Sequence, residues 1–270
     1  MKDVFIPMTS IASGLGQEAA DDLYCLPIQI VNISFVGRPD HWVLVDAGMP
    51  GSADDILAAA RERFGSDARP KAVILTHGHF DHVGALVDLV RHWDVPVYAH
   101  EQELPYLTGR ADYPEPDGSV EGGLLAKIAP IYPNQGIDLG DHVQSLPADG
   151  SVPELPDWKW IHTPGHTPGH VSFFREQDRC LIAGDAFITV RQDSLFKVLA
   201  QTEEISGPPR YLTPDWPAAW DSVKRLAALR PEVAVTGHGL PAAGESLAAG
   251  LDKLAREFDR TAIPDYGRFV

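Results

Sequence analysis

Three histidines and one aspartate lie within a six-residue segment of the sequence, at His77, His79, Asp81 and His82. Neutral imidazole and carboxylate groups are the ligands that Zn²⁺, Mn²⁺ and iron prefer in proteins. The segment follows a short apolar run and precedes apolar residues at helical spacing, so we expect it to join a strand to a helix. His77 and His79 would point to one side of an extended chain, and Asp81 and His82 would lie in the first helical turn. The segment can therefore offer two pairs of ligands to two neighbouring cations.

A second group of histidines surrounds a repeated Thr-Pro-Gly-His tetrapeptide. His162 precedes it, and His166 and His170 end its two copies. A spacing of four fits one face of a helix, but the intervening prolines and glycines disfavour a helix. We expect a rigid turn that leads into a strand, and a rigid backbone preorganises a metal ligand. These residues alone leave open which of the three histidines would bind a metal.

Two further candidates stand at the ends of apolar, strand-like runs. Asp185 follows Ala-Gly, and His238 lies between two glycines. Taken alone, an aspartate at a strand end commonly caps a turn. A histidine between glycines is as often a simple loop residue as a metal ligand. The combination is more informative than either residue, because all four segments with ligand residues lie at strand ends. A carboxylate has two oxygens, so Asp185 can bridge two cations.

The elements that must position these residues alternate between strands and helices, which is typical of an α/β protein. Residues 103–123 are interrupted by proline and glycine, so we expect a long loop with one helical turn. We expect this loop and the mixed segment 187–211 to flank the pocket, and we expect a single domain over residues 1–270. Strands are expected at 28–36, 41–45, 71–76, 95–99, 158–162, 170–175, 179–183 and 233–236, and helices at 52–64, 83–92, 216–229 and 244–258.

The composition restricts the classes of partner. Lys and Arg number 22 against 38 Asp and Glu, a net charge of −16, which argues against nucleic-acid and anionic-membrane binding but not against cations. Cys25 and Cys180 have neither disulfide-framework nor Cys-x-x-Cys spacing, so we expect buried thiols in a reducing compartment. The first residues do not form a signal-peptide pattern, and no run approaches about 20 apolar residues. We therefore expect a cytoplasmic protein that acts on a small molecule, with a homodimer as its expected assembly if it is not a monomer.

Together these motifs resemble the signature of the metallo-β-lactamase superfamily. The signature is His-x-His-x-Asp-His, a histidine in a Pro-Gly-His turn, an aspartate after glycine and a late Gly-His, all found here in order between residues 77 and 238. The Asp-Ala-Gly at residues 46–48 is similar to the family's strand-end Asp-x-Gly. The resemblance covers essentially the whole chain. It implies a four-layer αβ/βα sandwich in which two mixed sheets pack face to face, helices cover them, and metals bind at one edge.

Carried over residue by residue, the resemblance implies a site for two divalent metal ions, with zinc expected and manganese or iron as alternatives. Asp185 would bridge the two ions, and Asp46 would orient a ligand. His162 and His170 would then be structural. Asp81 would be the catalytic residue that orients a hydroxide and passes a proton to the leaving group. One ion would be held by His77, His79 and His166, and the other by Asp81, His82 and His238.

The resemblance implies a metal-dependent hydrolase that uses a hydroxide between two metal ions to cleave an ester-like bond of a small molecule, such as a thioester or a lactone. The alternatives are a sulfur dioxygenase with one iron, held without His82 or His238, and a β-lactamase or phosphoesterase. β-Lactamases usually carry Cys or Ser where Asp185 stands. The short segment after His238 argues against the glutathione-binding domain of glyoxalase II. Ile188 stands where some lactonases have tyrosine, which argues against acyl-homoserine lactones.

A few charged and aromatic residues are candidates for contact with the substrate. Arg191 and Lys197 are candidates for contact with a substrate carboxylate or phosphate, and solvated surface charge is the alternative. Four aromatic residues are candidates for an acyl site, with a place in the core as the alternative: Phe80, Phe187, Tyr211 and Trp216.

Overall fold

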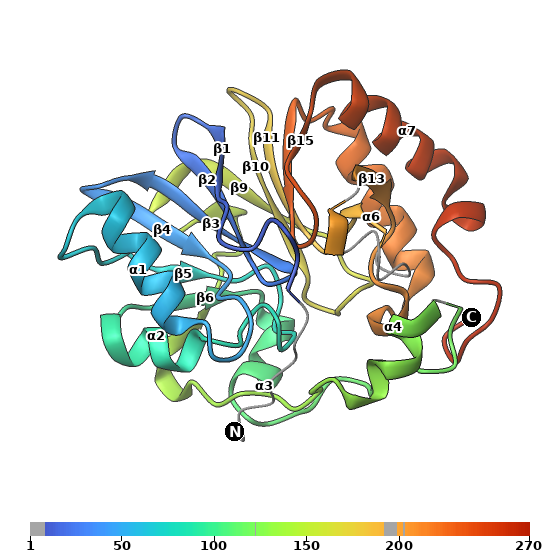
Figure 1. Cartoon of the computed structure of the whole chain (residues 1–270), viewed down its shortest axis with the longest axis horizontal. Coiled ribbons are helices and arrows are strands. Elements are labelled where there is room, and N and C mark those ends of the chain that lie inside the picture. Colours follow the sequence, from blue (N-terminus) through green and yellow to red (C-terminus); the bar gives the residue numbers. More distant parts are fainter. Residues whose placement is uncertain (1–8, 122, 192–198, 202) are drawn as a thin grey trace.

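The computed structural model describes residues 9–121, 123–191, 199–201 and 203–270. Two β-sheets pack face to face, and helices cover the outer face of each (Figure 1). This is the four-layer αβ/βα sandwich that the sequence predicts. Within the described residues, none of the helices combines the length and the apolar composition needed to cross a membrane.

The first sheet has seven strands in sequence order. Its first four strands pair antiparallel and the remaining pairs are parallel, so the sheet is mixed. Helices α1 (Ala53–Phe64) and α2 (Leu86–Trp93) make the crossovers between the parallel strands and cover the outer face. The strands are β1 (Gln17–Ala20), β2 (Leu23–Ile28), β3 (Val31–Arg38), β4 (His41–Val45), β5 (Val73–Ile74), β6 (Val97–Ala99) and β7 (Val143–Ser145).

The second sheet has six strands, in the order β15-β14-β11-β10-β9-β8. Helices α6 (Trp216–Ala228) and α7 (Gly244–Thr261) pack on its outer face, where apolar side chains recur at helical spacing. The strands are β8 (Ser151–Val152), β9 (Leu155–His162), β10 (Val171–Arg175), β11 (Cys180–Gly184), β14 (Val233–Thr236) and β15 (Ala242–Ala243), and a separate pair is formed by β12 (Ile188–Val190) and β13 (Glu203–Ser206).

Short helices lie in the connections. The helical turn expected in residues 103–123 is α3 (Leu104–Leu107), preceded by the 3₁₀ turn η1 (Glu101–Glu103). The other short helices are α4 (Gly123–Ile128), η2 (Ala129–Ile131), η3 (Gly140–His142) and η4 (Arg210–Leu212).

The core between the sheets is built from side chains of both. Val45 and Ile74 from the first sheet pack with Trp158, Phe173 and Ile182 from the second, and all are buried. Burying each large apolar side chain contributes roughly 1.5–3 kcal/mol, so this layer is the main stabilising contact between the two sheets. Cys25 and Cys180 are free, buried thiols, as expected.

A buried arginine adds a polar tie between the sheets. Arg175 of β10 donates to both carboxylate oxygens of Asp22, in the β1–β2 turn, at 2.7 and 2.8 Å. It also donates to Asp178, and its guanidinium lies 4.8 Å from the Trp158 ring centroid. The positive charge of the buried guanidinium is therefore balanced by two carboxylates.

The predicted strand over 28–36 is confirmed only for residues 31–36, which lie in β3. Residues 28–36 do not form a single strand, because β2 ends at Ile28 and β3 begins at Val31. Gln29 in the intervening turn has φ of 61°, and its N–H donates to the Ser13 hydroxyl at 2.9 Å. Both strands are almost fully buried, so the apolar pattern continues across the turn and conceals it. The expected helices over 52–64, 216–229 and 244–258 are confirmed as α1, α6 and α7.

Candidate metal centre

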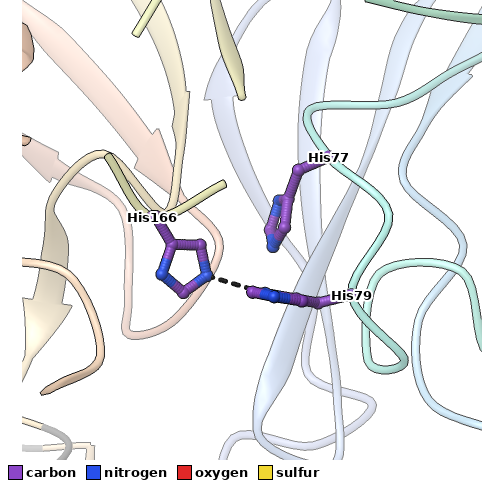
Figure 2. A group of neighbouring side chains, drawn as sticks. All are labelled: His77, His79 and His166. Carbon is purple, nitrogen blue, oxygen red and sulfur yellow. Dashed lines mark hydrogen bonds between the residues drawn. The ribbon is translucent and has the colours of Figure 1, made fainter. Parts of the chain in front are cut away.

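The candidate ligands gather at one edge of the sandwich, where strands of both sheets end. His77 and His79 follow β5 of the first sheet, and His166 lies in the connection between β9 and β10 of the second. Figure 2 shows these three rings turned toward one another, with His79 Nδ1 and His166 Nε2 2.9 Å apart. Asp185 directly follows β11, and His238 follows β14. The expected convergence of strand ends is therefore present.

Asp81 and His82 do not lie in the first turn of a helix, contrary to the sequence-based expectation. They belong to a separate turn in which the His82 N–H donates to the His79 carbonyl at 2.9 Å, and α2 begins only at Leu86. Before the helix begins, the Gly84 N–H donates to the Gly48 carbonyl at 2.8 Å, and this backbone packs so closely that a Cβ on Gly84 would lie 2.1 Å from the Pro50 nitrogen. This turn points both side chains into the site.

The seven predicted site residues form three overlapping groups. Asp185 links them, since its Oδ2 lies 3.4 Å from His166 Nε2 and 3.2 Å from His238 Nε2. The first and last groups coincide with the two ligand sets that the resemblance implied. Within each group the ligand atoms lie within 4.8 Å of one another: His77, His79 and His166; His77, His82 and Asp185; and Asp81, His82 and His238.

The donor chemistry of these groups fits two divalent cations. In the described part of the chain, four buried polar atoms of the site have no hydrogen-bond partner: His77 Nε2, His82 Nε2, Asp81 Oδ1 and Asp185 Oδ1. An unsatisfied buried polar atom is costly, so a cluster of four requires compensation. Imidazole nitrogens and carboxylate oxygens suit zinc, manganese and iron. Bound cations would satisfy all four atoms at once.

The first ligand set is electrically neutral. Burial, reinforced by neighbouring imidazoles, holds the pKa of His77 and of His166 well below the usual range, and burial lowers the pKa of His79 to about 4. At neutral pH these three rings are therefore unprotonated, which is the form that binds metals.

The second ligand set is strongly charged. Burial alone would lower the pKa of His82, but the carboxylates of Asp46, Asp185 and Asp81 raise it to about 9. Burial would raise the pKa of Asp185, but His238 and His82 hold it well below its usual range. Asp185 is therefore ionised and favours positive charge beside it. A metal cation can supply that charge in place of protons on the histidines.

Surrounding residues orient the ligands. Asp46 accepts hydrogen bonds from Thr76 N–H and Oγ1, both at 2.8 Å, and from His82 Nδ1 at 2.9 Å. Asp46 therefore fixes the orientation of the His82 ring and directs its Nε2 toward the other candidate ligands. His170 Nε2 accepts from the Asp185 N–H at 2.8 Å, so His170 has the expected structural role.

The remaining two histidines are also oriented by backbone carbonyls. His238 Nδ1 donates to the Ile30 carbonyl at 2.8 Å, which directs Nε2 toward the carboxylates. His162 Nε2 donates to the Pro168 carbonyl at 2.8 Å, and its ring stacks on His100 with centroids 4.4 Å apart. His162 is therefore a structural residue at the end of β9, as the resemblance implied. Of the three histidines in this segment, His166 is the one that joins the site.

The sequence analysis missed Glu103, a fully buried carboxylate between the two histidine segments. Its Oε2 accepts from the Gly78 N–H at 2.9 Å and from the Tyr113 hydroxyl. Its Oε1 accepts from Thr167 Oγ1 and the Gly169 N–H, both at 2.8 Å. One carboxylate therefore ties together the two loops that carry His77, His79 and His166. No local pattern marks this glutamate, because its four partners come from three separate segments.

A pocket opens beside two of the candidate ligands. Residues of the loop over 103–123 line it, and Tyr211 is the described residue of segment 187–211 that lines it. The pocket is lined by His79, Tyr106, Tyr113, Pro114, Glu115, His166, Pro168, Tyr211, Leu212, Pro214 and Phe269.

The other substrate-contact candidates lie elsewhere. Phe187 and Trp216 are core residues, and Phe80 packs against Tyr132 with ring centroids 5.6 Å apart. Arg191 lines a different cavity, and its guanidinium lies 3.8 Å from the Glu204 carboxylate. Lys197 falls outside the described residues.

Several known proteins are similar to this chain in sequence or in fold. The family model for the metallo-beta-lactamase superfamily matches residues 26–238. The chain is 50% identical over 258 residues to "Probable metallo-hydrolase YflN" of Bacillus subtilis (strain 168), which covers 94% of this chain and 98% of the relative. The crystal structure of TTHA1623 in a di-iron-bound form is 30% identical, with a TM-score of 0.56 over 85% of this chain and 94% of that one. A β-lactamase from Chitinophaga pinensis, 20% identical, shares the fold with a TM-score of 0.63 over 96% and 97% of the two chains.

The comparisons agree with the geometry of the site and of the two sheets. The expected fold is confirmed, and so is an enzyme of the metallo-hydrolase class whose histidine and aspartate groups are consistent with two metal ions. The chain belongs to the metallo-β-lactamase superfamily.

Proposed function

We propose that this protein is a hydrolase that holds two divalent cations and cleaves an ester-like bond of a small molecule, such as a thioester or a lactone. The observation that carries the proposal is the position of Asp185 between two complete ligand groups, His77–His79–His166 and Asp81–His82–His238. Retention of His82 and His238 favours two ions over one.

When bound, two such ions lower the pKa of a shared water molecule and polarise the substrate's carbonyl oxygen. Asp81 accepts and passes on the proton of the attacking water. Burial would raise the pKa of Asp81, but His82 and His238 lower it, so the group is an ionised carboxylate that can accept a proton. Its Oδ2 lies 3.4 Å from His238 Nε2, and its Oδ1 has no hydrogen-bond partner among the described residues. Asp81 therefore orients the attacking water and hands its proton to the leaving group.

The identity of the metals is a separate part of the proposal. Zinc is favoured by the histidine-rich donor set, and manganese or iron fit the same ligands. The di-iron form of TTHA1623 supports iron as the main competitor, because that chain is similar over nearly its whole length.

The test is metal analysis by elemental mass spectrometry on protein purified without chelators, together with hydrolysis of a panel of thioesters, lactones and phosphoesters. We expect about two equivalents of metal in the wild type and fewer in Asp185→Ala, with hydrolysis lost. Glu176→Ala, at an exposed acidic residue, is the matched control and should retain both metals. One equivalent of iron that survives loss of His238, with oxygen uptake and no hydrolysis, would refute the proposal in favour of a sulfur dioxygenase.

A further inference from the structure

The pocket beside His79 and His166 is walled by three segments that are distant in sequence. One wall is the loop that follows α3, with Tyr106 and Tyr113, and a second is the segment that contains Tyr211 and Leu212. The third wall is Phe269, next to the last residue of the chain. The pocket encloses about 50 Å³, or about 370 Å³ when the space at its open mouth is counted.

The lining is aromatic and rigid. The Tyr106 and Tyr113 rings stack with centroids 3.9 Å apart, and the Tyr113 ring lies 4.6 Å from the His79 ring. The Tyr113 hydroxyl is hydrogen-bonded to Glu103, so this ring is held in place. Three prolines complete the walls, at positions 114, 168 and 214. Rings held in this way present flat apolar surface at little entropic cost.

The charge of the remaining lining residues disfavours anionic groups. Apart from the two candidate metal ligands, Glu115 is the ionisable acid among the described lining residues, and neither lysine nor arginine is present there. Away from the end of the pocket that carries the candidate metal ligands, a substrate carboxylate or phosphate would therefore be desolvated beside an acidic residue, with no lysine or arginine of the lining to pair with it. An uncharged group meets no such cost.

The C-terminal segment is attached to the pocket loop, which positions Phe269. The Arg268 N–H donates to the Asp117 carboxylate, and the Arg268 guanidinium donates to the Glu115 carbonyl. The chain end accordingly lies beside the segment that leads into α4 (Figure 1). Phe269 is half-buried and follows these anchors directly, so its place against the pocket is set by the loop that forms the opposite wall.

We propose that this pocket binds the acyl group of the substrate, that the group is uncharged and apolar with the size of an aromatic ring, and that Phe269 determines this specificity. The proposal rests on the proposed hydrolase function, since the acyl carbonyl must reach the neighbouring metal centre. An aromatic ring placed among Tyr106, Tyr113 and Phe269 gains ring contacts beyond simple burial of area.

The experiment compares kcat/KM for thioesters of one neutral thiol that carry acetyl, phenylacetyl or succinyl groups. Wild type should prefer phenylacetyl and should cleave the anionic succinyl thioester least efficiently. Phe269→Ala should lose about tenfold on phenylacetyl and change less than about twofold on acetyl, as expected when one apolar contact is removed. Tyr266→Ala is the control, because this tail side chain is 59% exposed and does not line the pocket.

Affinity is measured separately, by calorimetry with the ketone analogue in which a methylene replaces the thioester sulfur of the phenylacetyl substrate. Phe269→Ala should weaken its binding about tenfold. Equal acyl preference in wild type and Phe269→Ala, or a preference for succinyl, would overturn the pocket assignment and leave hydrolysis intact. Conversely, if the ketone binds as expected but no thioester or lactone is cleaved by protein carrying two metals, the hydrolase proposal fails and the pocket assignment survives.

Discussion

Replacing Glu103 by glutamine should weaken metal binding and destabilise the protein, although the two side chains have nearly the same shape. The glutamate accepts four hydrogen bonds, two at each oxygen. Glutamine has one oxygen and an NH₂ group that can only donate. Whichever way the amide is turned, its NH₂ group must face two of the four donors.

The cost follows from which of these donors can adapt. The hydroxyl groups of Thr167 and Tyr113 can rotate and accept a bond from the amide, but the N–H groups of Gly169 and Gly78 cannot. With its NH₂ group toward Gly169 the amide leaves that buried N–H unpaired. With its NH₂ group toward Gly78 it leaves that N–H only the Tyr113 hydroxyl, 3.1 Å away, so we expect a cost of about 1–3 kcal/mol. Glu103→Ala removes all four bonds at once and leaves the Gly78 N–H only its longer bond to the Tyr113 hydroxyl, so we expect it to cost at least about 3 kcal/mol.

Metal affinity should fall for a different reason. Glu103 holds the loop of His77 and His79 against the loop of His166, so its loss lets the three ligands move apart. Residues that orient metal ligands typically contribute roughly 10–100-fold to affinity, and we expect a loss in that range for Glu103→Gln. Urea unfolding of the metal-free protein measures the stability change, and titration with Zn²⁺ measures the affinity.

Glu101→Gln is the matched control, because Glu101 lies two residues earlier in η1 and is exposed. It should leave both measurements unchanged. The reasoning would be refuted if Glu103→Gln unfolded at the same urea concentration and bound zinc as tightly as the control. The reasoning would also be refuted if Glu103→Ala were as stable as Glu103→Gln, or more stable.

Three further predictions concern the metal centre and the tie between the sheets. Gly237→Ala should cost at least one metal equivalent in elemental analysis, because its Cβ would lie 2.0 Å from Asp185 Oδ1; two retained equivalents would contradict this. Chelation should lower the thermal midpoint, because it leaves the buried ligand atoms unsatisfied, and added Zn²⁺ should restore it; an unchanged midpoint would argue against bound metal. Burial would raise the pKa of Asp178, but hydrogen bonds from Arg175 lower it, so its stabilising contribution is present at neutral pH and is lost as pH falls below about 4. Asp178→Asn should therefore lose up to about 1 kcal/mol at pH 7 and show a weaker loss of stability in acid, measured by urea unfolding, whereas Glu176→Gln should behave as wild type.

The sequence by itself determined the family, the layered fold and the candidate ligands. His77 to His82 place four ligand residue types in one short segment, and such a density has few explanations other than metal binding. The long amphipathic helices α1, α6 and α7 were predictable because their apolar periodicity extends over three or more turns. The β2–β3 turn was not predictable, because buried strands on both sides keep the pattern apolar throughout.

Only the tertiary structure decided how the site is supported and bounded. It shows the loop geometry that turns the His166 ring toward His79, which the histidine motif itself left open and only the resemblance implied. It also brought Glu103 between two ligand loops and placed Phe269 against the pocket. These contacts join segments far apart in the chain, and each depends on how the layers pack. A residue's own neighbours in sequence carry no record of such packing, so local patterns could indicate which residues bind metal but not what holds them there.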